Sequence, residues 1–447
     1  MQQKQALEML KLGYNVFLTG AAGSGKTFLL NQYIAHLQKF HVPVAVTAST
    51  GIAATHMDGV TIDSWSGVGI AESLTDQNIK NLQNKLHLRI RLLATKVLII
   101  DEVSMIHASK LDLIDRVLRT FRSSNHPFGG MQVIFCGDFF QLPPVCFAEA
   151  STRRVGDGSN GHDYIFKSRV WNSMNIRICY LEKAHRQKED GYLKILDAVR
   201  ANHMDDATFQ ILISRIGKPI TSHMAIPKLF THNVDVDAIN LQELEKINEK
   251  PHEYSMKTKG PPPLVEAMKK SCLAPERLTL KRGATVMFVR NNMKEGFVNG
   301  TLGKVVAFDR DNNPIVELLS NRKITVYPLQ WTITEQNVVK AEITQIPLRL
   351  AWAITVHKSQ GMTLDCAEVD LSKAFVTGMG YVALSRVKSL SGLRLLGLNE
   401  LALKVDPEIV KFDQGLRQKS QEEVIKLRSL GWFKRFMQKR HFMYKIT

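Results

Sequence analysis

The stretch that most constrains the fold is residues 20–27, which read GAAGSGKT and fit the pattern G-x-x-x-x-G-K-[ST]. Residues 15–19 form a short apolar run that predicts a buried strand, and an apolar-periodic segment from Lys26 predicts a helix. Glycines allow backbone N–H groups to converge on phosphate oxygens, and the start of a helix adds a favourable dipole. The sequence therefore predicts an α/β domain with a phosphate-binding loop at the end of a strand.

The residues of this loop complete a nucleotide site. Lys26 is placed to neutralise the β- and γ-phosphates, and the Thr27 hydroxyl is placed to bind Mg²⁺. Gly23, Ser24 and Gly25 supply the backbone that surrounds the phosphates. At about 7% glycine, a chance match to this pattern is roughly a one-in-a-hundred event, so a plain glycine-rich turn is the weaker interpretation.

Three further apolar runs, at 44–47, 97–100 and 133–136, alternate with helix-like segments. This alternation predicts a parallel sheet covered on both faces, with ligand sites at the carboxyl ends of its strands. Asp101 and Glu102 directly follow the second run, in the form of a Walker B element. We expect Asp101 to bind Mg²⁺ and Glu102 to lie near the attacking water, which together with the loop predicts ATP hydrolysis.

The net charge indicates a polyanionic partner. The chain has 59 Lys and Arg against 42 Asp and Glu, a formal net charge of +17, which favours nucleic acid over an ordinary metabolite as substrate. The five cysteines include no CxxC pair, which excludes a zinc-ribbon framework and indicates a reducing compartment. Apolar runs are only strand-length and no signal-peptide pattern is present, so we expect a cytoplasmic protein without a transmembrane segment.

The length of 447 residues predicts roughly three parts. We expect a first α/β domain at 1–175, a second at 176–407 that starts with a strand near Tyr180, and a C-terminal tail at 408–447.

Within the second domain, further strands are expected at 228–230 and 284–289, and a proline-rich loop at 257–263. Residues 301–346 change character, because short strands there are separated by Asn- and Asp-containing turns. This pattern predicts a small inserted β-barrel.

Seven motifs outside the loop resemble those of a known family. They are TGIAA at 50–54, DEVSM at 101–105, PFGG at 127–130, GDFFQLPP at 137–144, LEKAHRQ at 181–187, TVHKSQGMT at 355–363 and YVALSRV at 381–387. From Gln3 to about Gly397, the chain closely resembles the Pif family of superfamily-one DNA helicases. The resemblance implies two RecA-like P-loop NTPase domains with parallel sheets, ATP and Mg²⁺ as cofactors, and single-stranded DNA crossing both domains.

The resemblance also implies nucleotide roles for individual residues. Gln3 would read the adenine, Gln141 would sense the γ-phosphate, and Gly361 would belong to the nucleotide site. Arg186 and Arg386 would be arginine fingers from the second domain, since an arginine at the γ-phosphate stabilises the charge of the transition state. Outside these motifs, an isolated arginine is more simply explained as a surface ion-pair partner.

Ten positions match the DNA-binding residues of the family: Thr50, Gly51, Thr61, Ser64, Trp65, Asn233, Asn291, His357, Lys358 and Ser359. Hydroxyl, amide and backbone groups bind phosphates without reading sequence, and an aromatic ring such as that of Trp65 can stack on a base. A lone histidine is more often structural, so His357 depends on its motif. Asp63 stands where the family usually has His, so the contact beside it is expected to be weaker or water-mediated.

By the same resemblance, residues 301–346 match an SH3-like insertion and residues 67–95 a short wedge insertion. From its residues alone, the basic stretch at 80–96 fits a solvated helix face and a nucleic-acid contact equally well. The chain lacks the long N-terminal extension of eukaryotic relatives, so we expect a minimal core of bacterial or viral type.

The function implied is that of a monomeric helicase that moves 5′ to 3′ and unwinds duplex, forked or G-quadruplex DNA in replication, repair, recombination or telomere maintenance. Two alternatives stay open. One is a RecD-like subunit of a larger DNA-processing complex, and the other is a non-motor DNA-binding protein with a degenerate ATPase.

The C-terminal residues 426–447 hold seven Lys and Arg and no acid, interleaved with five aromatic residues. This mixture suits nucleic-acid binding through phosphate attraction and base stacking. It equally suits an amphipathic helix on an anionic membrane. A third interpretation is a helix that packs its aromatic residues on the second domain, and a replication or repair partner could also dock there.

Overall fold

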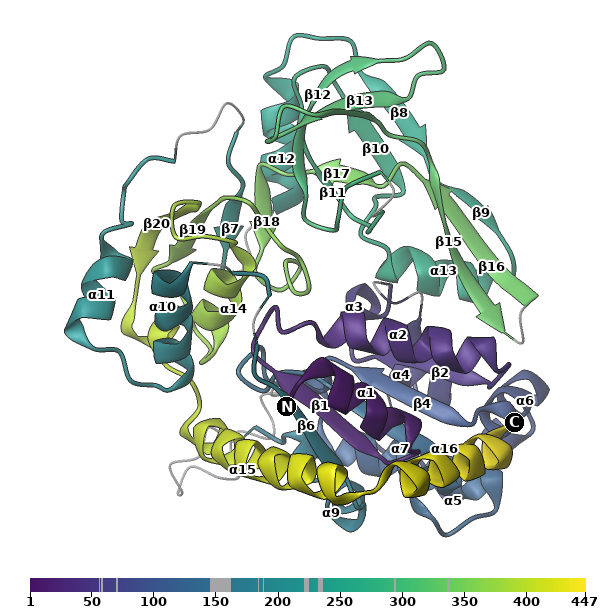
Figure 1. Cartoon of the computed structure of the whole chain (residues 1–447). Helices are drawn as coiled ribbons and strands as arrows, with labels where there is room; N and C mark the ends of the chain where they lie inside the picture. The colour runs from purple at the N-terminus through teal and green to yellow at the C-terminus, as the bar shows by residue number, and fades with distance from the viewer. Residues whose placement is uncertain are drawn as a thin grey trace. The chain divides into compact units, whose positions relative to one another are not determined.

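The computed structural model describes residues 1–55, 57, 59–69, 71–144, 162–183, 185–187, 189–220, 225–231, 236–292, 295–335 and 338–447. These residues form two compact units. Unit 1 comprises residues 1–185 and 406–447, and unit 2 comprises residues 186–405 (Figure 1). The C-terminal segment therefore belongs to the same unit as the N-terminal part of the chain, and not to the second domain as one interpretation expected.

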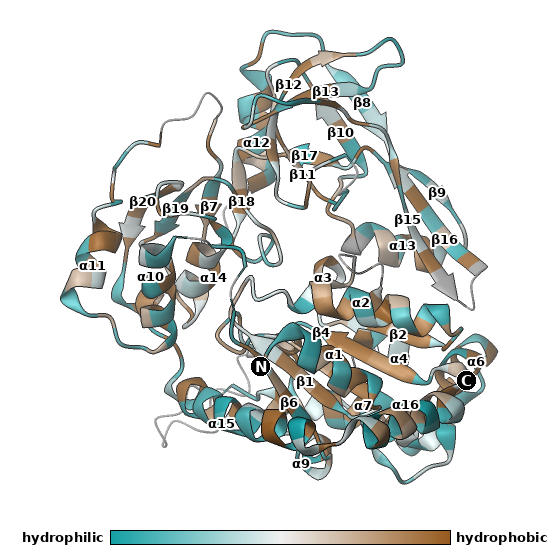
Figure 2. Ribbon diagram, viewed as in Figure 1, coloured by the Kyte–Doolittle hydropathy of each residue, from teal (hydrophilic) through white to brown (hydrophobic). Residues whose placement is uncertain are grey.

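Within the described residues, unit 1 is built on a parallel sheet whose six strands lie in the order β3-β2-β4-β5-β1-β6. The strands are β1 (Val16–Gly20), β2 (Val44–Ala48), β3 (Val60–Thr61), β4 (Val97–Asp101), β5 (Gln132–Cys136) and β6 (Arg177–Leu181). Every residue of β1, β4 and β5 is buried, as their continuous apolar runs predict, and β4 is brown in Figure 2. The predicted α/β sheet is confirmed.

The strand near Tyr180 is predicted correctly, but its place is not. We expected it to open the second domain, whereas β6 pairs in parallel with β1 along its whole length, from Val16 opposite Arg177 to Gly20 opposite Leu181. A short apolar run predicts a strand but does not say which sheet it joins.

Helices cover both faces of this sheet. They are α1 (Gln3–Lys11), α2 (Lys26–Lys39), α3 (Gly51–Thr55), α4 (Ile62–Ser66), α5 (Asp76–Gln83), α6 (Leu86–Ala94), α7 (Ala108–Arg122), α9 (Arg169–Ser173), α15 (Pro407–Ser429) and α16 (Trp432–Ile446), with 3-10 turns at Val103–Met105, Pro127–Gly130 and Ile165–Lys167. The segment expected to form a wedge contains α5 and α6. No helix within the described ranges is long and apolar enough to cross a membrane.

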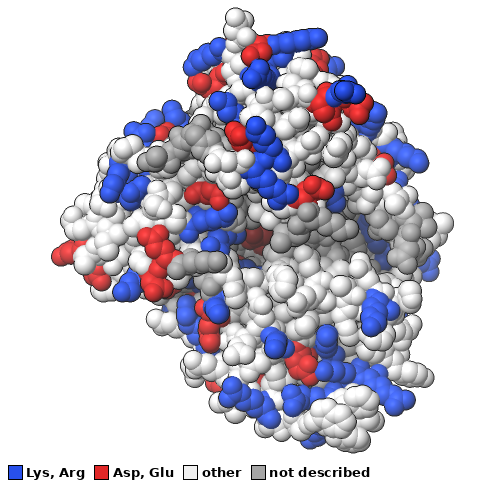
Figure 3. Space-filling model, turned by 45° about the horizontal axis from the view of Figure 1, so that its top comes forward, with Lys and Arg blue, Asp and Glu red and all other residues white. Residues whose placement is uncertain are grey.

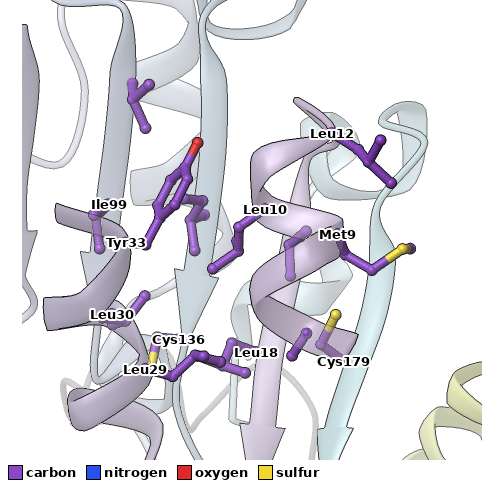
Figure 4. Packing of buried hydrophobic residues seen from close by; sticks show 14 of the residues in the cluster. Met9, Leu10, Leu12, Leu18, Leu29, Leu30, Tyr33, Ile99, Cys136 and Cys179 are labelled. Atoms are coloured by element: carbon purple, nitrogen blue, oxygen red, sulfur yellow. The ribbon is translucent and has the colours of Figure 1, made fainter. Parts of the chain in front are cut away.

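One core cluster joins α1, α2 and the strands beneath them. Met9 and Leu10 of α1 and Leu29 and Leu30 of α2 belong to it, and Figure 4 shows Leu29 close to Leu18 of β1 and Met9 on the side of α1 that faces Cys179 of β6. Leu427 of α15 and Ile446 of α16 belong to the same cluster. The two ends of the chain are therefore packed into one hydrophobic core.

Unit 2 contains a parallel sheet of four strands among its described residues, in the order β18-β7-β19-β20. Its strands are β7 (Lys228–Phe230), β18 (Ala353–Thr355), β19 (Ala367–Leu371) and β20 (Leu393–Leu398), accompanied by α10 (Asp190–Arg200), α11 (Asp206–Ile213), α12 (Val236–Glu245), α14 (Met379–Arg386) and a 3-10 turn at Glu400–Leu403. This second α/β unit is the one that the sequence predicts.

The rest of unit 2 is mostly antiparallel. Its elements are β8 (His252–Ser255), β9 (Lys257–Lys259), α13 (Pro262–Ser271), β10 (Arg277–Leu280), β11 (Thr285–Phe288), β12 (Leu302–Phe308), β13 (Pro314–Leu318), β14 (Lys323–Thr325), β15 (Leu329–Glu335), β16 (Val338–Gln345) and β17 (Leu348–Leu350). One sheet has the order β14-β13-β12-β11-β17, and β15, β16 and β9 form another.

Two expectations about this region are wrong. The strand predicted at 284–289 is present as β11, but it lies in the antiparallel sheet and not in the parallel one, so the β-rich region extends beyond 301–346. Residues 257–263 are not a loop: β9 occupies their start and α13 begins at Pro262. Proline is well suited to the first turn of a helix, where its missing N–H would have no partner.

Candidate nucleotide and nucleic-acid sites

The loop at residues 20–27 leaves the carboxyl end of β1 and leads into α2. Gly23 and Gly25 have φ values of +78° and +85°, in the left-handed region that favours glycine. A Cβ atom at Gly25 would lie 2.2 Å from Nε2 of Gln3. Both the backbone conformation and the close approach of Gln3 therefore require glycine at this position.

Lys26 folds back over this loop. Its Nζ donates hydrogen bonds to the carbonyl oxygens of Gly20 at 2.8 Å and Ala21 at 3.2 Å. The neighbouring Ser24 is 1% exposed, and its Oγ has no hydrogen-bond partner among the described residues. A buried polar atom of this kind normally has a partner, so the loop offers unused hydrogen-bonding capacity beside a cation.

Asp101 lies at the end of β4, on the same edge of the sheet. Its Oδ1 accepts a hydrogen bond from the backbone N–H of Glu102 at 2.9 Å, and Glu102 has a φ of +50°. Burial raises the pKa of Asp101, and the charge of Lys26 acts in the opposite direction, together with hydrogen bonds from Cys136 and Glu102. Lys26 and Asp101 are thus electrostatic neighbours, as a shared nucleotide site requires.

Gln141 provides a second unused polar atom at this edge. It follows β5, its backbone N–H donates to the Asp138 carbonyl at 3.0 Å, and its Oε1 is buried without a partner among the described residues. The side chains of Ser24, Lys26, Asp101 and Gln141 together fit a phosphorylated nucleotide with a divalent cation, since they offer a cation, a carboxylate and two unpaired polar groups.

Gln3 is the first residue of α1, and its Nε2 donates to the Ser24 carbonyl at 3.2 Å. The start of the chain is held in place, because the Met1 amino group donates to the Tyr180 carbonyl at 2.8 Å and pairs with Glu182 at 2.8 Å. Gln3 is therefore positioned against the phosphate loop, although its reading of adenine stays a prediction.

The two predicted arginine fingers meet inside unit 2. Arg186 Nη1 donates to the Ser385 carbonyl at 3.0 Å, and Arg386 Nη2 donates to Ser385 Oγ at 2.8 Å. Arg386 is only 1% exposed. Gln187, which sequence reasoning missed, also donates to the Ser385 carbonyl, at 3.1 Å. The sequence signal that could have identified Gln187 was its position directly after Arg186, in the LEKAHRQ motif.

The DNA-binding positions predicted in unit 1 lie near α3 and α4. Thr50 Oγ1 accepts from the Ala53 N–H at 3.2 Å, Gly51 begins α3, and Thr61 Oγ1 accepts from the Ser64 N–H at 3.3 Å. These residues are helix caps as well as candidate phosphate contacts.

Trp65 does not fit the role expected for it. Its side chain is 3% exposed and belongs to the buried interior, so the ring offers no face for base stacking in this structure. Beside it, the Asp63 carboxylate pairs with Lys110 at 3.3 Å, and Lys110 also donates to the carbonyls of Gly69 and Ala71. Asp63 therefore anchors the segment after α4.

The predicted positions in unit 2 fall into three groups. Asn233 lies outside the described residues. Asn291 is exposed, the surface of His357 is open while protein atoms partly desolvate its ring, and Lys358 pairs with Asp237 at 3.8 Å. Ser359 is fully buried and its Oγ donates to the Val356 carbonyl at 2.7 Å, so its hydroxyl is not available to a phosphate.

Gly361 has a φ of +78° in the turn after these residues, and its role in nucleotide binding stays a prediction. The protein atoms around the His357 ring lower the pKa of this histidine, because partial burial disfavours the charged imidazolium. At neutral pH it would therefore act as a hydrogen-bonding group and not as a cation.

Comparison with known proteins relates this arrangement to one family. The model described as PIF1-like helicase matches residues 2–222, and the model for the 2B domain of DNA helicase Pif1 matches residues 263–308. The chain is 43% identical to the ATP-dependent DNA helicase Pif1 of Psychrobacter sp. (strain PRwf-1), covering 91% of this chain and 69% of that protein. Against the human ATP-dependent DNA helicase PIF1 the identity is 35%, with 93% and 64% covered.

Solved structures give the same result. A Bacteroides sp. Pif1 in complex with ADP-AlF4 is 31% identical with a TM-score of 0.79, over 94% of this chain and 97% of that one. A Bacteroides Pif1 bound to single-stranded DNA is 33% identical with a TM-score of 0.63, over 95% and 98%. The chain spans about two thirds of the length of the two curated relatives.

Proposed function

Because the chain belongs to the PIF1-like helicase family of ATP-dependent DNA helicases, we propose that it uses ATP and Mg²⁺ to move 5′ to 3′ along single-stranded DNA and to unwind duplex, forked and G-quadruplex DNA. The observation that carries the proposal is the edge of the unit 1 sheet. There Asp101 is buried, and the charge of Lys26 opposes the rise in pKa that this burial causes. Ser24 Oγ and Gln141 Oε1 have no hydrogen-bond partner among the described residues.

Each residue of this edge takes a separate task. Lys26 neutralises the β- and γ-phosphates, and backbone N–H groups of residues 23–27 orient them. Thr27 and Asp101 would hold Mg²⁺, which supplies further charge neutralisation when bound. Glu102 orients the attacking water and Gln141 Oε1 accepts a hydrogen bond from it. Gln141 Nε2 would donate to the γ-phosphate, and Gln3 reads the adenine.

Arg186 and Arg386 stabilise the negative charge of the transition state, which is worth about 10³–10⁵ in rate where an arginine finger has been removed. Ser385 and Gln187 position these two arginines through the hydrogen bonds described above. Arginine suits this task because its planar fork keeps its charge and can bind two oxygens at once.

DNA is held mainly by groups that do not read sequence. The hydroxyls of Thr50, Thr61 and Ser64 and the backbone at Gly51 contact phosphates in unit 1, and Asn291, His357 and Lys358 do so in unit 2. We assign residues 67–95 to a wedge and the β-rich region around 301–346 to an SH3-like accessory domain. The motor acts as a monomer in replication or repair.

The test is strand displacement with ATP and Mg²⁺ on two partial duplexes that differ only in bearing a 5′ or a 3′ single-stranded tail. Unwinding from the 5′ tail alone supports the direction, and unwinding from the 3′ tail refutes it. The matched control is Lys26→Ala, which should lose ATP hydrolysis and keep DNA affinity in nucleotide-free buffer, because other residues contact the DNA. ATP hydrolysis that DNA does not stimulate would refute the motor itself.

A further inference from the structure

Helix α16 exposes aromatic side chains that the nucleotide and DNA sites do not use. Trp432 is 73% exposed, Phe433 66%, Phe436 47% and Met437 46%. The rings of Trp432 and Phe436 stack on each other, with centroids 5.7 Å apart and an interplanar angle of 16°. We call these four residues, with the basic Lys434 and Arg440 between and beside them, the α16 face. An exposed apolar patch of this kind commonly marks an interaction site.

The exposure does not come from a loosely attached helix. The opposite side of α16 is packed into unit 1, where Phe442, Met443 and Ile446 join the core cluster. Polar contacts fix the same side: Gln438 Nε2 donates to the Leu12 carbonyl at 3.1 Å, and Tyr14 OH donates to Gln438 Oε1 at 3.3 Å. The aromatic face is therefore presented outward by a helix whose C-terminal half, from Gln438 to Ile446, is anchored to unit 1.

The surroundings of this face are basic. Residues 426–447 contain no acid, and Lys434, Arg440 and Lys445 form no ion pair with any residue that the structure describes. Lys11 of α1, Lys39 of α2 and Lys439 of α16, which pairs with Glu8, all help burial to lower the pKa of His36, so positive charges from three helices lie near His36 of α2. Figure 3 shows Lys and Arg side chains gathered along the lower edge of its view, on unit 1. Such a surface attracts a polyanion.

The face also lies away from the candidate motor residues. Phe442 contacts the chain at Gly13, just before the amino end of β1, and a Cβ there would lie 2.3 Å from its ring. The phosphate loop and the segment at Thr50 follow the carboxyl ends of β1 and β2. In a parallel sheet these are opposite edges, so a ligand on α16 does not occupy the DNA path assigned to unit 1.

We propose that the α16 face is a second binding site for single-stranded DNA, in which bases stack on Trp432, Phe433 and Phe436 while Lys434 and Arg440 contact phosphates. Stacking on aromatic rings within a basic surface is how proteins bind single strands without sequence preference. The inference rests on the proposed function, because it takes the polyanion that binds this face to be the DNA substrate. The site would hold a strand that the motor is not translocating and keep the enzyme on its substrate.

The experiment compares the full-length wild type with the triple variant Trp432→Ala/Phe433→Ala/Phe436→Ala by fluorescence anisotropy. The probes are oligo(dT) of about 40 nucleotides, which can span two sites, and of about 8 nucleotides, which fills one. We expect affinity for the long probe to fall at least about tenfold, because each base that no longer stacks costs about 1–3 kcal/mol and tenfold corresponds to about 1.4 kcal/mol. Affinity for the short probe, and ATP hydrolysis stimulated by it, should stay unchanged.

A charge variant tests the phosphate contacts separately. Lys434→Gln/Arg440→Gln should reduce the slope of log K against log salt for the long probe by about 0.7 for each phosphate that the variant no longer neutralises. Two matched controls should leave long-probe binding unchanged: Phe375→Ala, at an exposed ring of unit 2, and Lys419→Gln, at an exposed lysine of α15. Since the altered side chains are exposed, circular dichroism and melting temperature should not change.

Three results would overturn the proposal. The first is equal affinity of the triple variant and the wild type for the long probe. The second is binding to vesicles with anionic lipids that the triple variant loses while its DNA affinity is intact, which identifies a membrane surface. The third is a wild-type dimer that the triple variant dissociates without a change in DNA binding. Absence of DNA-stimulated ATP hydrolysis in the wild type would instead refute the proposed function.

Discussion

Gly25→Ala tests whether the phosphate loop and α1 are held together as the structure shows. Gly25 precedes α2 with a φ of +85°, and a Cβ there would lie 2.2 Å from Gln3 Nε2. The substitution therefore does two things at once. It places an L side chain in the left-handed region, and it displaces the end of Gln3 from the hydrogen bond that it donates to the Ser24 carbonyl.

The free-energy costs of Gly25→Ala are partly offset by a gain. The left-handed conformation costs about 1–2 kcal/mol for a residue with a Cβ. Loss of one hydrogen bond costs about 1 kcal/mol. Alanine also narrows the unfolded ensemble, which returns about 0.4–1 kcal/mol. We expect unit 1 to be destabilised by about 1–2 kcal/mol and nucleotide affinity to fall, because the loop must widen to accept the methyl group.

Hydrogen exchange of peptides from residues 1–55 along a urea series reports unit 1 alone, and a fluorescent ATP analogue reports the site. Gly415→Ala is the matched control. Gly415 lies inside α15, and a Cβ there meets nothing within 4 Å. Alanine in a helix interior is favoured by about 1 kcal/mol, so this control should stabilise unit 1 and leave nucleotide binding unchanged.

A double variant decides between the two causes. Gln3→Ala alone should cost about 1 kcal/mol, the value of its hydrogen bond. Gln3→Ala with Gly25→Ala should cost no more than Gly25→Ala alone, because the side chain that the methyl group displaces is already gone. Additive free energies would show that the two residues do not compete for the same space, and the reasoning would be refuted.

Three further predictions test other parts of the molecule. Arg386→Lys should lower DNA-stimulated ATP hydrolysis about a thousandfold with little change in nucleotide affinity. Lysine has no planar fork with which to keep the Ser385 contact and also bind phosphate oxygens. Near-normal turnover would show that Arg386 is not an arginine finger. Ile446→Ala should destabilise unit 1 by about 2–4 kcal/mol in the same exchange assay, because the Ile446 side chain is only 6% exposed. Tyr444 is 86% exposed, so Tyr444→Ala should change the stability of unit 1 by less than about 0.5 kcal/mol. Burial lowers the pKa of His36 from 6.5, and the charges of Lys11, Lys439 and Lys39 lower it further, so the folded state favours the neutral ring. The contribution of the neutral ring to stability is therefore complete above pH 6.5. It is lost as the pH falls from 6.5 through the lower pKa of the folded state. His36→Gln should therefore lose less stability between about pH 7 and 5 than the wild type in urea unfolding, and equal losses would contradict this assignment.

Local patterns predict the strands of unit 1 and the edge of the sheet at which the candidate nucleotide residues lie. The phosphate loop, Asp101 and Glu102 lie at the ends of strands whose apolar runs are long enough to be recognised, and a parallel sheet brings such ends to one edge. Lys26 and Asp101 are therefore neighbours in space because their strands, β1 and β4, flank β5 in the same sheet.

Patterns fail where the outcome depends on long-range packing. The sequence cannot say that β6 joins β1, or that β11 leaves the parallel sheet, because strand pairing is decided by partners far along the chain. Motif membership likewise does not separate side chains that contact a ligand from those that support the loop. Trp65 and Ser359 stand in DNA-binding motifs, yet one is packed in the interior and the other bonds its own turn.

The C-terminal helices α15 and α16 also support the elements that carry the nucleotide site, so the choice of variant determines what a DNA-binding assay can show. Gln3 is carried by α1, which α16 holds through an ion pair between Glu8 and Lys439 and through the bond from Gln438 to the Leu12 carbonyl. The β6 strand that anchors the Met1 amino group is itself held by α15, where Ser420 Oγ accepts from the Tyr180 N–H at 3.0 Å.

Removal of residues 408–447 would therefore disturb Gln3 as well as remove ten Lys and Arg residues, seven of them in residues 426–447. A truncated protein that binds DNA weakly could have lost either a DNA contact or the geometry of its nucleotide site. Substitutions at Trp432, Phe433 and Phe436 alter only outward-facing rings and leave the anchored side of α16 intact. Point variants on this face, and not truncation, can thus separate a DNA site from a brace for α1.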